Sequence, residues 1–251
     1  MKVALAALIA ALTTTSAQAP LSYSVRRAGA VHVDGIISDS EWGRAAWTSD
    51  FVDIEGAAKP RPLLRTRAKL LWDDAYLYIA AELTEPHVWG TLMERDAVIY
   101  RDNDFEVFID PDGDTFDYYE LEINALGTVW DLFLTKPYRD NGHAINAWDI
   151  RGLQSAVHIN GTLNNPADQD TSWTIELALP WSVLKEAAPE HRAPVAGDEW
   201  RLNFSRVEWD VVARAGTYVK ERRPEHNWVW SPQGTINMHA PEKWGRIHFE
   251  Q

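Results

Sequence analysis

Short runs that alternate apolar and polar residues dominate the chain and predict β-strands. Residues 63–72 and 76–83 flank Asp73 and Asp74 and predict a hairpin. Helical periodicity is weak, and only residues 38–46 and 181–187 suggest short helices. The pattern indicates an all-β fold, an antiparallel β-sandwich of the jelly-roll or immunoglobulin-like kind with long loops. Further strands are expected at residues 105–109, 118–124, 128–134, 173–179, 200–209 and 243–249, and long loops at 137–152, 160–170 and 217–238.

The N-terminus has the three parts of a secretory signal peptide. Lys2 precedes an apolar run at residues 3–12, and Ala17-Gln18-Ala19 has the small-residue pattern of a cleavage site. Such a run is too short to cross a bilayer as a helix, which needs about 20 residues. We therefore expect a signal peptide at 1–19, one domain at 20–251, and a periplasmic or extracellular location.

Composition narrows the class of partner. The formal net charge is −13, which disfavours nucleic acid and acidic membrane surfaces because both attract basic proteins. The chain has no Cys, which excludes disulfides and thiolate sites. It has 13 Trp, whose flat faces suit sugar rings as well as a core. A carbohydrate ligand therefore fits the composition; the oligomeric state cannot be inferred from it.

Alternation along two predicted strands gathers acidic residues on one face. In residues 104–109, Asp104 and Glu106 share a face, and the odd-numbered apolar positions form the opposite, core-facing side. Arg206, in a third strand, is expected to pair with these carboxylates or to hold a sugar hydroxyl. An ordinary solvated face with ion pairs is the alternative. In the strand at 118–124 the polar face consists of Glu120, Glu122 and Asn124, of which Asn124 is a candidate hydroxyl partner.

A turn rich in aspartate follows the first of these strands. Asp110, Asp112 and Asp114 supply three carboxylates at alternate positions. Hard oxygen ligands in a flexible turn suit calcium, and we treat this ion as a possible cofactor. A plain Asp-rich turn without metal is the alternative.

The segments that carry a family resemblance are, in chain order, residues 33–35, 41–42, 71–78, 102–111, 118–120, Asn124, 176–181, 200–206 and 239–245. Taken together, they resemble the family 9 carbohydrate-binding modules, a β-sandwich group first seen attached to xylanases. The resemblance runs from about residue 31 to the C-terminus, and it implies a free-standing exported member that binds glycans without catalysis. Calcium binding in this family adds weight to the Asp110 turn.

The resemblance also implies a binding site. Sugar-binding members hold a glycan end between two aromatic faces beside a carboxylate, and by position Tyr100 is one aromatic residue and Glu106 the carboxylate. The second aromatic position is occupied here by Met238. Trp228 and Trp230 in the adjacent segment are candidates to replace the lost wall.

A glycoside hydrolase is one alternative. Retaining and inverting glycosidases need two carboxylates on either side of the scissile bond, and Asp104 with Glu106, or Glu106 with Glu122, are the candidate pairs. The sequence has no serine nucleophile elbow, His-rich zinc motif or phosphate-binding loop. Catalysis is therefore the less favoured reading.

An exported haem-binding electron-transfer domain is the other alternative, because the same sandwich resembles domains that hold haem iron between Met and His or Lys. The candidate ligands are Met93, Met238, His143, His239 and Lys220. A surface or core-filling methionine explains the same residues more simply.

Overall fold

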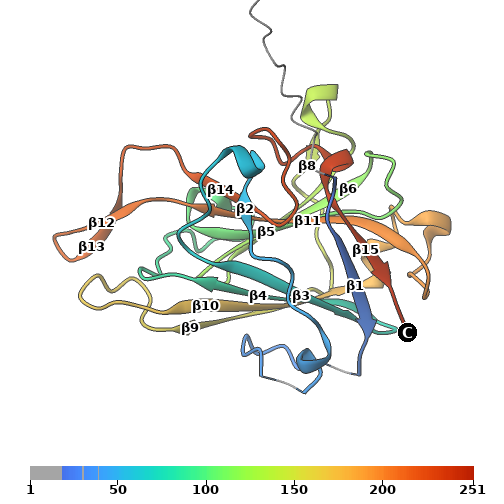
Figure 1. Ribbon diagram of the computed structural model, residues 1–251, viewed down its shortest axis with the longest axis horizontal. Helices are drawn as coiled ribbons and strands as arrows, with labels where there is room; N and C mark the ends of the chain where they lie inside the picture. Colours follow the sequence, from blue (N-terminus) through green and yellow to red (C-terminus); the bar gives the residue numbers. More distant parts are fainter. Residues whose placement is uncertain (1–18, 30, 39) are drawn as a thin grey trace, which may run out of the picture.

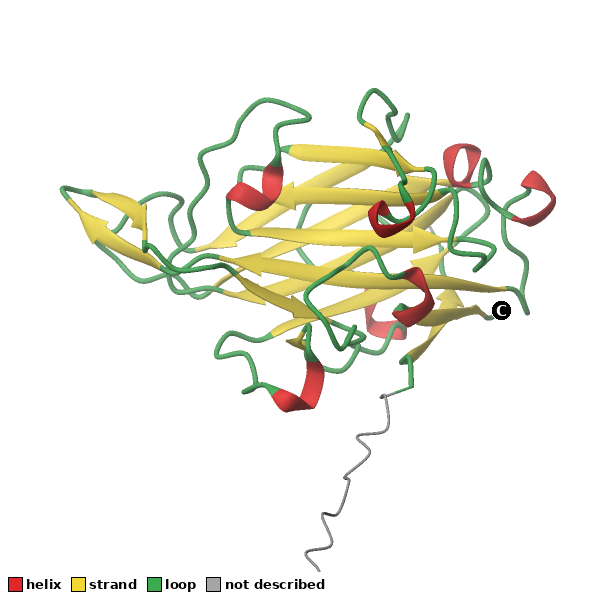
Figure 2. Cartoon of the chain, turned by 90° about the horizontal axis from the view of Figure 1, so that it is seen from above, coloured by secondary structure: helices red, strands yellow, loops and turns green. Residues whose placement is uncertain are grey.

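Two layers of β-sheet face each other across an apolar core, which confirms the predicted β-sandwich (Figures 1 and 2). The structure is a computed structural model that describes residues 19–29, 31–38 and 40–251. Apart from Ala19, the predicted signal peptide lies outside the described residues. Among the helices of the described part, none is long and apolar enough to cross a membrane.

The strands are hydrogen-bonded in the order β8-β7-β6-β5-β11-β15-β1-β3-β4-β10-β9, with β14 added to β11 and β2 to β14. The first layer contains β2 (Val52–Asp53), β5 (Asp104–Asp110), β6 (Tyr118–Asn124), β7 (Val129–Leu134), β8 (Ala144–Ile145), β11 (Glu199–Glu208), β14 (His226–Val229) and β15 (Gly245–Phe249). The second contains β3 (Thr66–Trp72), β4 (Tyr76–Thr84), β9 (Gln154–Asn160) and β10 (Ser172–Pro180). A separate hairpin of β12 (Val211–Arg214) and β13 (Thr217–Lys220) projects from the body (Figures 1 and 2).

Helical segments are short and lie in the connections. The predicted helix at 181–187 is present as α1 (Trp181–Leu184), whereas the one predicted at 38–46 is reduced to a single 3₁₀ turn, η1. The 3₁₀ turns are η1 (Trp42–Arg44), η2 (Gly56–Ala58), η3 (Ile99–Arg101), η4 (Tyr138–Asp140), η5 (Pro189–His191) and η6 (Pro241–Lys243).

Strand β1 (Ser22–Arg27) connects the two layers. Its residues 22–25 pair in parallel with 246–249 of β15, and its residues 26–27 pair in parallel with 71–72 of β3. In Figure 1, β1 passes from one layer to the other beside β15. The sheet is thus mixed rather than wholly antiparallel as predicted, because alternation specifies which face a residue occupies but not the direction of its neighbour.

The strands expected from alternation are present, and the β3–β4 hairpin shows why its turn forms. Asp73 Oδ1 accepts hydrogen bonds from the backbone N–H groups of Ala75 (2.7 Å) and Tyr76 (2.8 Å), which closes the turn. The expectation of a loop throughout 217–238 was wrong, because β13 and β14 lie within it.

The first layer is buried on both faces. Phe105, Val107 and Ile109 of β5 point into the core between the layers, as predicted. On the outer face, Phe108 belongs to a second apolar cluster with Met238, contributed by the segment that precedes β15. The even-numbered residues of β5 are therefore also withdrawn from solvent, so the polar ones among them are buried.

The sequence predicts that Arg206 lies on the acidic face, but its side chain is buried between the two layers. Its guanidinium donates hydrogen bonds to Glu208 (2.7 and 3.0 Å) and Glu85 (2.8 Å), and also to Thr66 Oγ1 (3.1 Å). The side chain is fully buried and its Cζ lies 5.3 Å from the ring centroid of Trp228. Strand alternation explains the correction, since Arg206 follows Phe204 by two residues and shares its inward face.

Replacing Arg206 with Ala should lower the free energy of unfolding by about 3–5 kcal/mol, because Glu85 and Glu208 would remain buried without a counter-charge. Urea denaturation measures this loss. The control is Arg65→Ala, which removes a half-exposed partner of Glu82 and should cost less than about 1 kcal/mol. Equal losses in the two variants would contradict a structural role for the buried cluster.

Candidate functional site

A cavity of about 510 Å³ opens on the outer face of the first layer, within the size range of small-ligand sites. We call it the acidic cavity. Tyr100, Glu106 and Met238, all predicted from the sequence, come together here. Its lining consists of Ile54, Tyr100, Glu106, Phe108, Glu120, Glu122, Trp130, Leu132, Tyr138, Val207, Glu225, Asn227, Ile236, Asn237, Met238 and His239.

Carboxylates form a cluster at the base of this cavity because β5 and β6 pair in register. Glu106 lies directly opposite Glu122, and Glu120 lies opposite Phe108 one step along the same face. One carboxyl oxygen each of Asp104, Glu106 and Glu122 lies within 4.8 Å of the others. All of these acidic residues are buried.

Burial controls the protonation of the cluster. It raises the pKa of Glu106 to about 7, and it raises the pKa values of Asp104, Glu120 and Glu122 well above the usual range, with further increases from neighbouring negative charges. The Oε2 atom of Glu120 is buried and receives no hydrogen bond from the described residues. The cluster therefore holds protons near neutral pH and offers acceptor atoms to a ligand.

Aromatic side chains from three segments complete the cavity. Tyr100, on η3, is tied to the cluster through its backbone N–H, which donates to Glu122 Oε2 at 2.9 Å. Its ring centroid lies 6.5 Å from that of Trp130 on β7, with an interplanar angle of 33°. Tyr138, on η4, packs edge-on against His239 at 4.5 Å. Trp130 and Tyr138 were not among the residues predicted from the sequence.

The other sequence-predicted residues lie elsewhere. Asn124 is buried, and its Nδ2 donates to Leu92 O (2.9 Å) and to Asp102 Oδ2 (3.1 Å). Trp230 belongs to the core, where a Cβ on Gly245 would come within 2.4 Å of its ring. Trp228 is the cross-strand partner of Arg206 and faces inward with it. The roles of these residues in binding stay predictions, and the structure does not bring them to the acidic cavity.

A larger cavity of about 680 Å³ is lined by Trp228 together with Glu85 and Glu208. Glu85 and Glu208 already accept hydrogen bonds from Arg206. The acidic cavity, by contrast, contains an acceptor without a donor and carries the predicted Tyr100 and Glu106. We therefore take the smaller cavity as the functional candidate.

In two further groups of aspartates, the carboxyl oxygens lie close to one another. In the turn after β5, one oxygen each of Asp110, Asp112 and Asp114 lies within 4.8 Å of the others. Asp110 also caps this turn, accepting from the N–H groups of Gly113 (2.9 Å) and Thr115 (3.1 Å), and burial raises its pKa to about 7. The oxygen donors thus fit a hard cation, although they already serve the turn itself.

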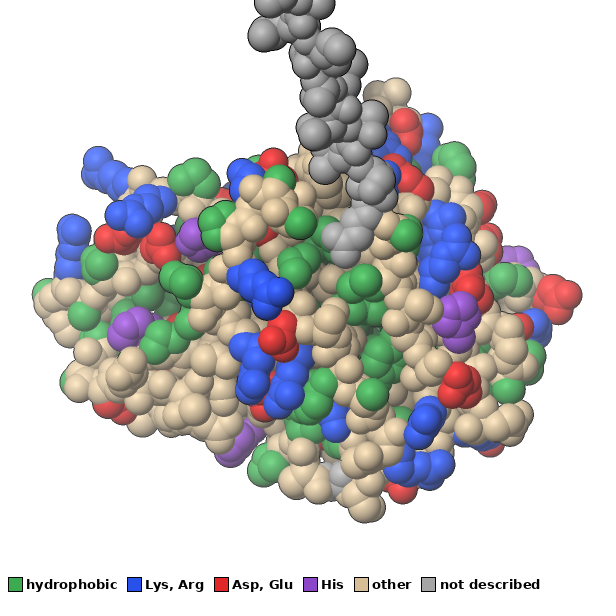
Figure 3. All heavy atoms as spheres, viewed as in Figure 1, with side chains coloured by type: hydrophobic (Ala, Val, Ile, Leu, Met, Phe, Trp, Pro, Cys, Tyr) green, Lys and Arg blue, Asp and Glu red, His purple; other side chains and the backbone are tan. Residues whose placement is uncertain are grey.

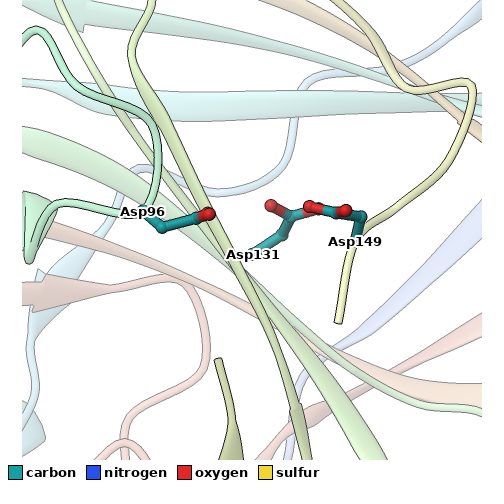
Figure 4. A group of neighbouring side chains, drawn as sticks. All are labelled: Asp96, Asp131 and Asp149. Carbon is teal, nitrogen blue, oxygen red and sulfur yellow. The ribbon is translucent and has the colours of Figure 1, made fainter. Parts of the chain in front are cut away.

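The second group, Asp96, Asp131 and Asp149, directs its carboxyl groups toward one another (Figure 4). Arg95 lies among them, forming an ion pair with Asp131 and another with Asp149 at 3.0 Å. Arg95 thus forms ion pairs with all three carboxylates, Asp96 included (3.8 Å), so we interpret the group as a structural ion-pair network.

The residues of the two alternative functions can be placed as well. Of the candidate haem ligands, Met238 and the adjacent His239 both line the acidic cavity, whereas Met93 lines a different one. Asp104, Glu106 and Glu122 lie together on a single sheet face rather than on opposite sides of a cleft. That arrangement does not provide two carboxylates flanking a glycosidic bond.

Comparison with known families identifies a match over most of the chain. The family model described as carbohydrate family 9 binding domain-like matches residues 33–250. Two curated relatives match about half of this chain: exoglucanase XynX of Acetivibrio thermocellus (24% identity over 117 residues) and endo-1,4-beta-xylanase A of Thermoanaerobacterium saccharolyticum (24% over 116 residues). The matched segments are only 9% and 8% of those enzymes' own lengths.

Solved structures share the fold. A carbohydrate binding module family 9 from Caldicellulosiruptor kristjanssonii, in complex with cellotriose, has a TM-score of 0.58 at 17% identity and covers 91% of this chain and 93% of its own. A Bacteroides uniformis protein for which carbohydrate binding has been proposed has a TM-score of 0.69 at 17% identity, covering 92% and 100%.

The buried carboxyls predict a pH-dependent stability. The pKa of Glu106 is about 7 in the folded protein against an ordinary 4.5, so the folded state binds more protons between these pH values and stability falls as pH rises through them. His239, with its pKa lowered to about 4, opposes this trend below pH 6.5, but it is one group against several carboxyls. Thermal unfolding should give a higher Tm at about pH 5.5 than at about pH 8.

A substitution in the cavity can show that this change of stability with pH, the pH slope, originates there. Glu122→Gln should reduce the slope by up to about 1.4 kcal/mol per pH unit, because one titrating carboxyl is lost. Glu250→Gln, at an exposed ion pair with Arg26, is the matched control and should leave the slope unchanged. A Tm that rises from pH 5.5 to 8 would refute the assignment.

Proposed function

The chain belongs to the carbohydrate family 9 binding domain-like family, and on that premise we propose that it binds an oligosaccharide or a glycan end without changing it chemically. The observation that carries the proposal is the acidic cavity, in which Tyr100, Trp130 and Tyr138 meet buried carboxylates. Flat aromatic faces pack against the C–H groups of a sugar ring, and carboxylates accept hydrogen bonds from its hydroxyls.

Met238 occupies the position at which the family has a second aromatic wall, and it lines the same cavity. Trp130 and Tyr138 supply aromatic surface close to that position, in place of the predicted Trp228 and Trp230. Tyr138 reaches the cavity from η4, and Trp130 lies opposite Glu122 in the β6–β7 ladder. We infer that the ligand contacts these two rings and Tyr100.

The titratable groups support binding rather than hydrolysis. The acidic residues of β5 and β6 share one sheet face, and Asp104 is fully enclosed. A general acid and a nucleophile or base must instead reach the glycosidic oxygen and the anomeric carbon from separate positions. The solved relative with cellotriose is a binding module, which agrees with this reading.

We also propose that the protein acts after export, in support of polysaccharide breakdown. The matched relatives carry the names of enzymes that act on glucan and xylan polymers, and such chains are too large to enter a cell intact. The leader-like residues 1–19 support the same proposal. On the face seen in Figure 3, basic and acidic side chains are interspersed, and this mixture does not favour a polyanionic partner.

Calcium remains a proposal for the Asp110 turn. The oxygens of Asp110, Asp112 and Asp114 lie close enough for one ion, and two of these carboxylates are exposed. An ion there would fix the turn after β5, the strand that carries Glu106, and so would act on the site through the scaffold.

Binding should depend on the rings of the acidic cavity. Tyr100→Ala and Trp130→Ala should each weaken oligosaccharide binding at least about tenfold, from a Kd between about 1 µM and 1 mM. Isothermal titration with cello- and xylo-oligosaccharides measures this, and chromatography of the same samples should detect no released sugar. Trp47→Ala is the control, since Trp47 stacks on Arg67 and Lys69 of the other layer.

Retained binding in both cavity variants, with loss in Trp228→Ala, would move the site to the larger cavity. Release of shorter sugars that is abolished in Glu106→Gln would replace the binding proposal with a hydrolytic one.

Calcium should raise the Tm by several degrees at about 10 mM, a concentration above the Kd of about 10⁻⁴–10⁻³ M typical of extracellular modules. Differential scanning fluorimetry with and without chelator measures the shift. Asp112→Asn with Asp114→Asn should abolish it, whereas Asp96→Asn, in the group paired with Arg95, should not. No calcium-dependent shift in the unmodified protein would refute the proposed ion.

A further inference from the structure

Acidic side chains line the acidic cavity without a basic counterpart. Glu106, Glu120, Glu122 and Glu225 line it, and none of the described residues in its lining is Lys or Arg. His239, the one imidazole there, has its pKa lowered to about 4 by burial and is neutral at physiological pH. The cavity can therefore carry negative charge only, and it favours a ligand that brings positive charge.

Buried glutamates of two other groups in the described chain are matched by donors. Glu85 and Glu208 contact Arg206, and Glu176 accepts hydrogen bonds from Trp42 Nε1 (2.6 Å) and from two backbone N–H groups. Glu120 differs, because it lines the cavity and its buried Oε2, like Oδ2 of the neighbouring Asp104, accepts no hydrogen bond from the described residues. A buried acceptor of this kind destabilises the folded protein when it is left without a donor.

We propose that the acidic cavity selects a carbohydrate with a free, protonated primary amine, that is, a de-N-acetylated amino sugar. This proposal rests on the carbohydrate-binding function proposed above and specifies its ligand class. An ammonium group has three N–H donors, and Glu106, Glu120 and Glu122 provide acceptors on one sheet face. Charge-assisted hydrogen bonds of this kind are roughly twice as strong as neutral ones.

The aromatic rings favour the same ligand. A cation near the face of a Tyr or Trp ring is attracted by the ring's negative face, and Tyr100 and Trp130 lie side by side at the cavity. The same rings can pack on the sugar's C–H groups. A neutral sugar would use this packing but would leave the carboxylates to share protons among themselves.

A divalent cation is the competing occupant, because oxygens of Asp104, Glu106 and Glu122 are close enough to ligate one. Asp104, however, is fully enclosed and does not line the cavity. The aromatic rings also supply no ligand for a hard metal. The observations therefore favour the ammonium group, and the experiment separates the two.

The test is isothermal titration of the full protein with three matched disaccharides: the glucosamine disaccharide with free amines, its N-acetylated form, and cellobiose. Each is titrated in chelator and again in calcium. The glucosamine disaccharide should bind at least about tenfold tighter than cellobiose in chelator, or about 1.4 kcal/mol. Glu120→Gln should reduce this affinity ratio severalfold, whereas Glu250→Gln, the same charge change at the exposed pair with Arg26, should preserve it.

Each other outcome overturns the proposal in a distinct way. Equal binding of the amine and neutral sugars would refute amine selection and leave the proposed carbohydrate binding standing. Binding of neutral sugars only in calcium, retained when Asp112→Asn and Asp114→Asn remove the ligands of the Asp110 turn, would assign the cluster to a metal. Binding of none of the three, in either buffer, would count against both this inference and the function on which it rests.

Discussion

The register between β5 and β6 is the constraint on which the site depends. Side chains alternate between the two faces of each strand, so the pairing of Glu106 with Glu122 brings the acidic residues of both strands together on the outer face. The residues between them point inward and complete the core. A shift of one residue would turn the carboxylates into the core and the apolar side chains outward. The hydrophobic contacts of Phe105 and Val107 therefore hold the acidic groups together, even though like charges repel.

The acidic residues have raised pKa values because the outer face of the first layer is covered by other parts of the chain. Had the outer face been open to water, Glu106 and its neighbours would have been an ordinary solvated acidic surface. Instead the segment that carries Met238 and His239 closes over it, and the apolar cluster around Phe108 removes most of the solvent. Burial is the first cause of each pKa increase in the cluster, so the electrostatics of the site follow from the packing of a loop.

The sequence predicted those parts of the molecule that depend on local alternation. The inward and outward residues of 104–109 and 118–124 are as expected, because one face of each strand is uniformly apolar. Arg206 was misplaced because β11 has polar residues on both faces, so alternation alone could not identify its inner side. Trp228 was taken for a loop residue, and the strand β14 that turns it inward begins only two residues before it. Tyr138 lies on a 3₁₀ turn that is distant in sequence from β5. No local sequence pattern indicates that its side chain reaches the cavity.

The parallel pairing of β1 with β15 has a mechanical consequence. Ser22 lies beside Arg246 and Val25 beside Phe249, so the two chain ends leave this ribbon in opposite directions. A pull between the ends would load all the hydrogen bonds of the ribbon at once, in shear, instead of opening them one after another. The pair would thus act as a clamp, and tension transmitted through flanking segments would reach the binding face only after this clamp had yielded.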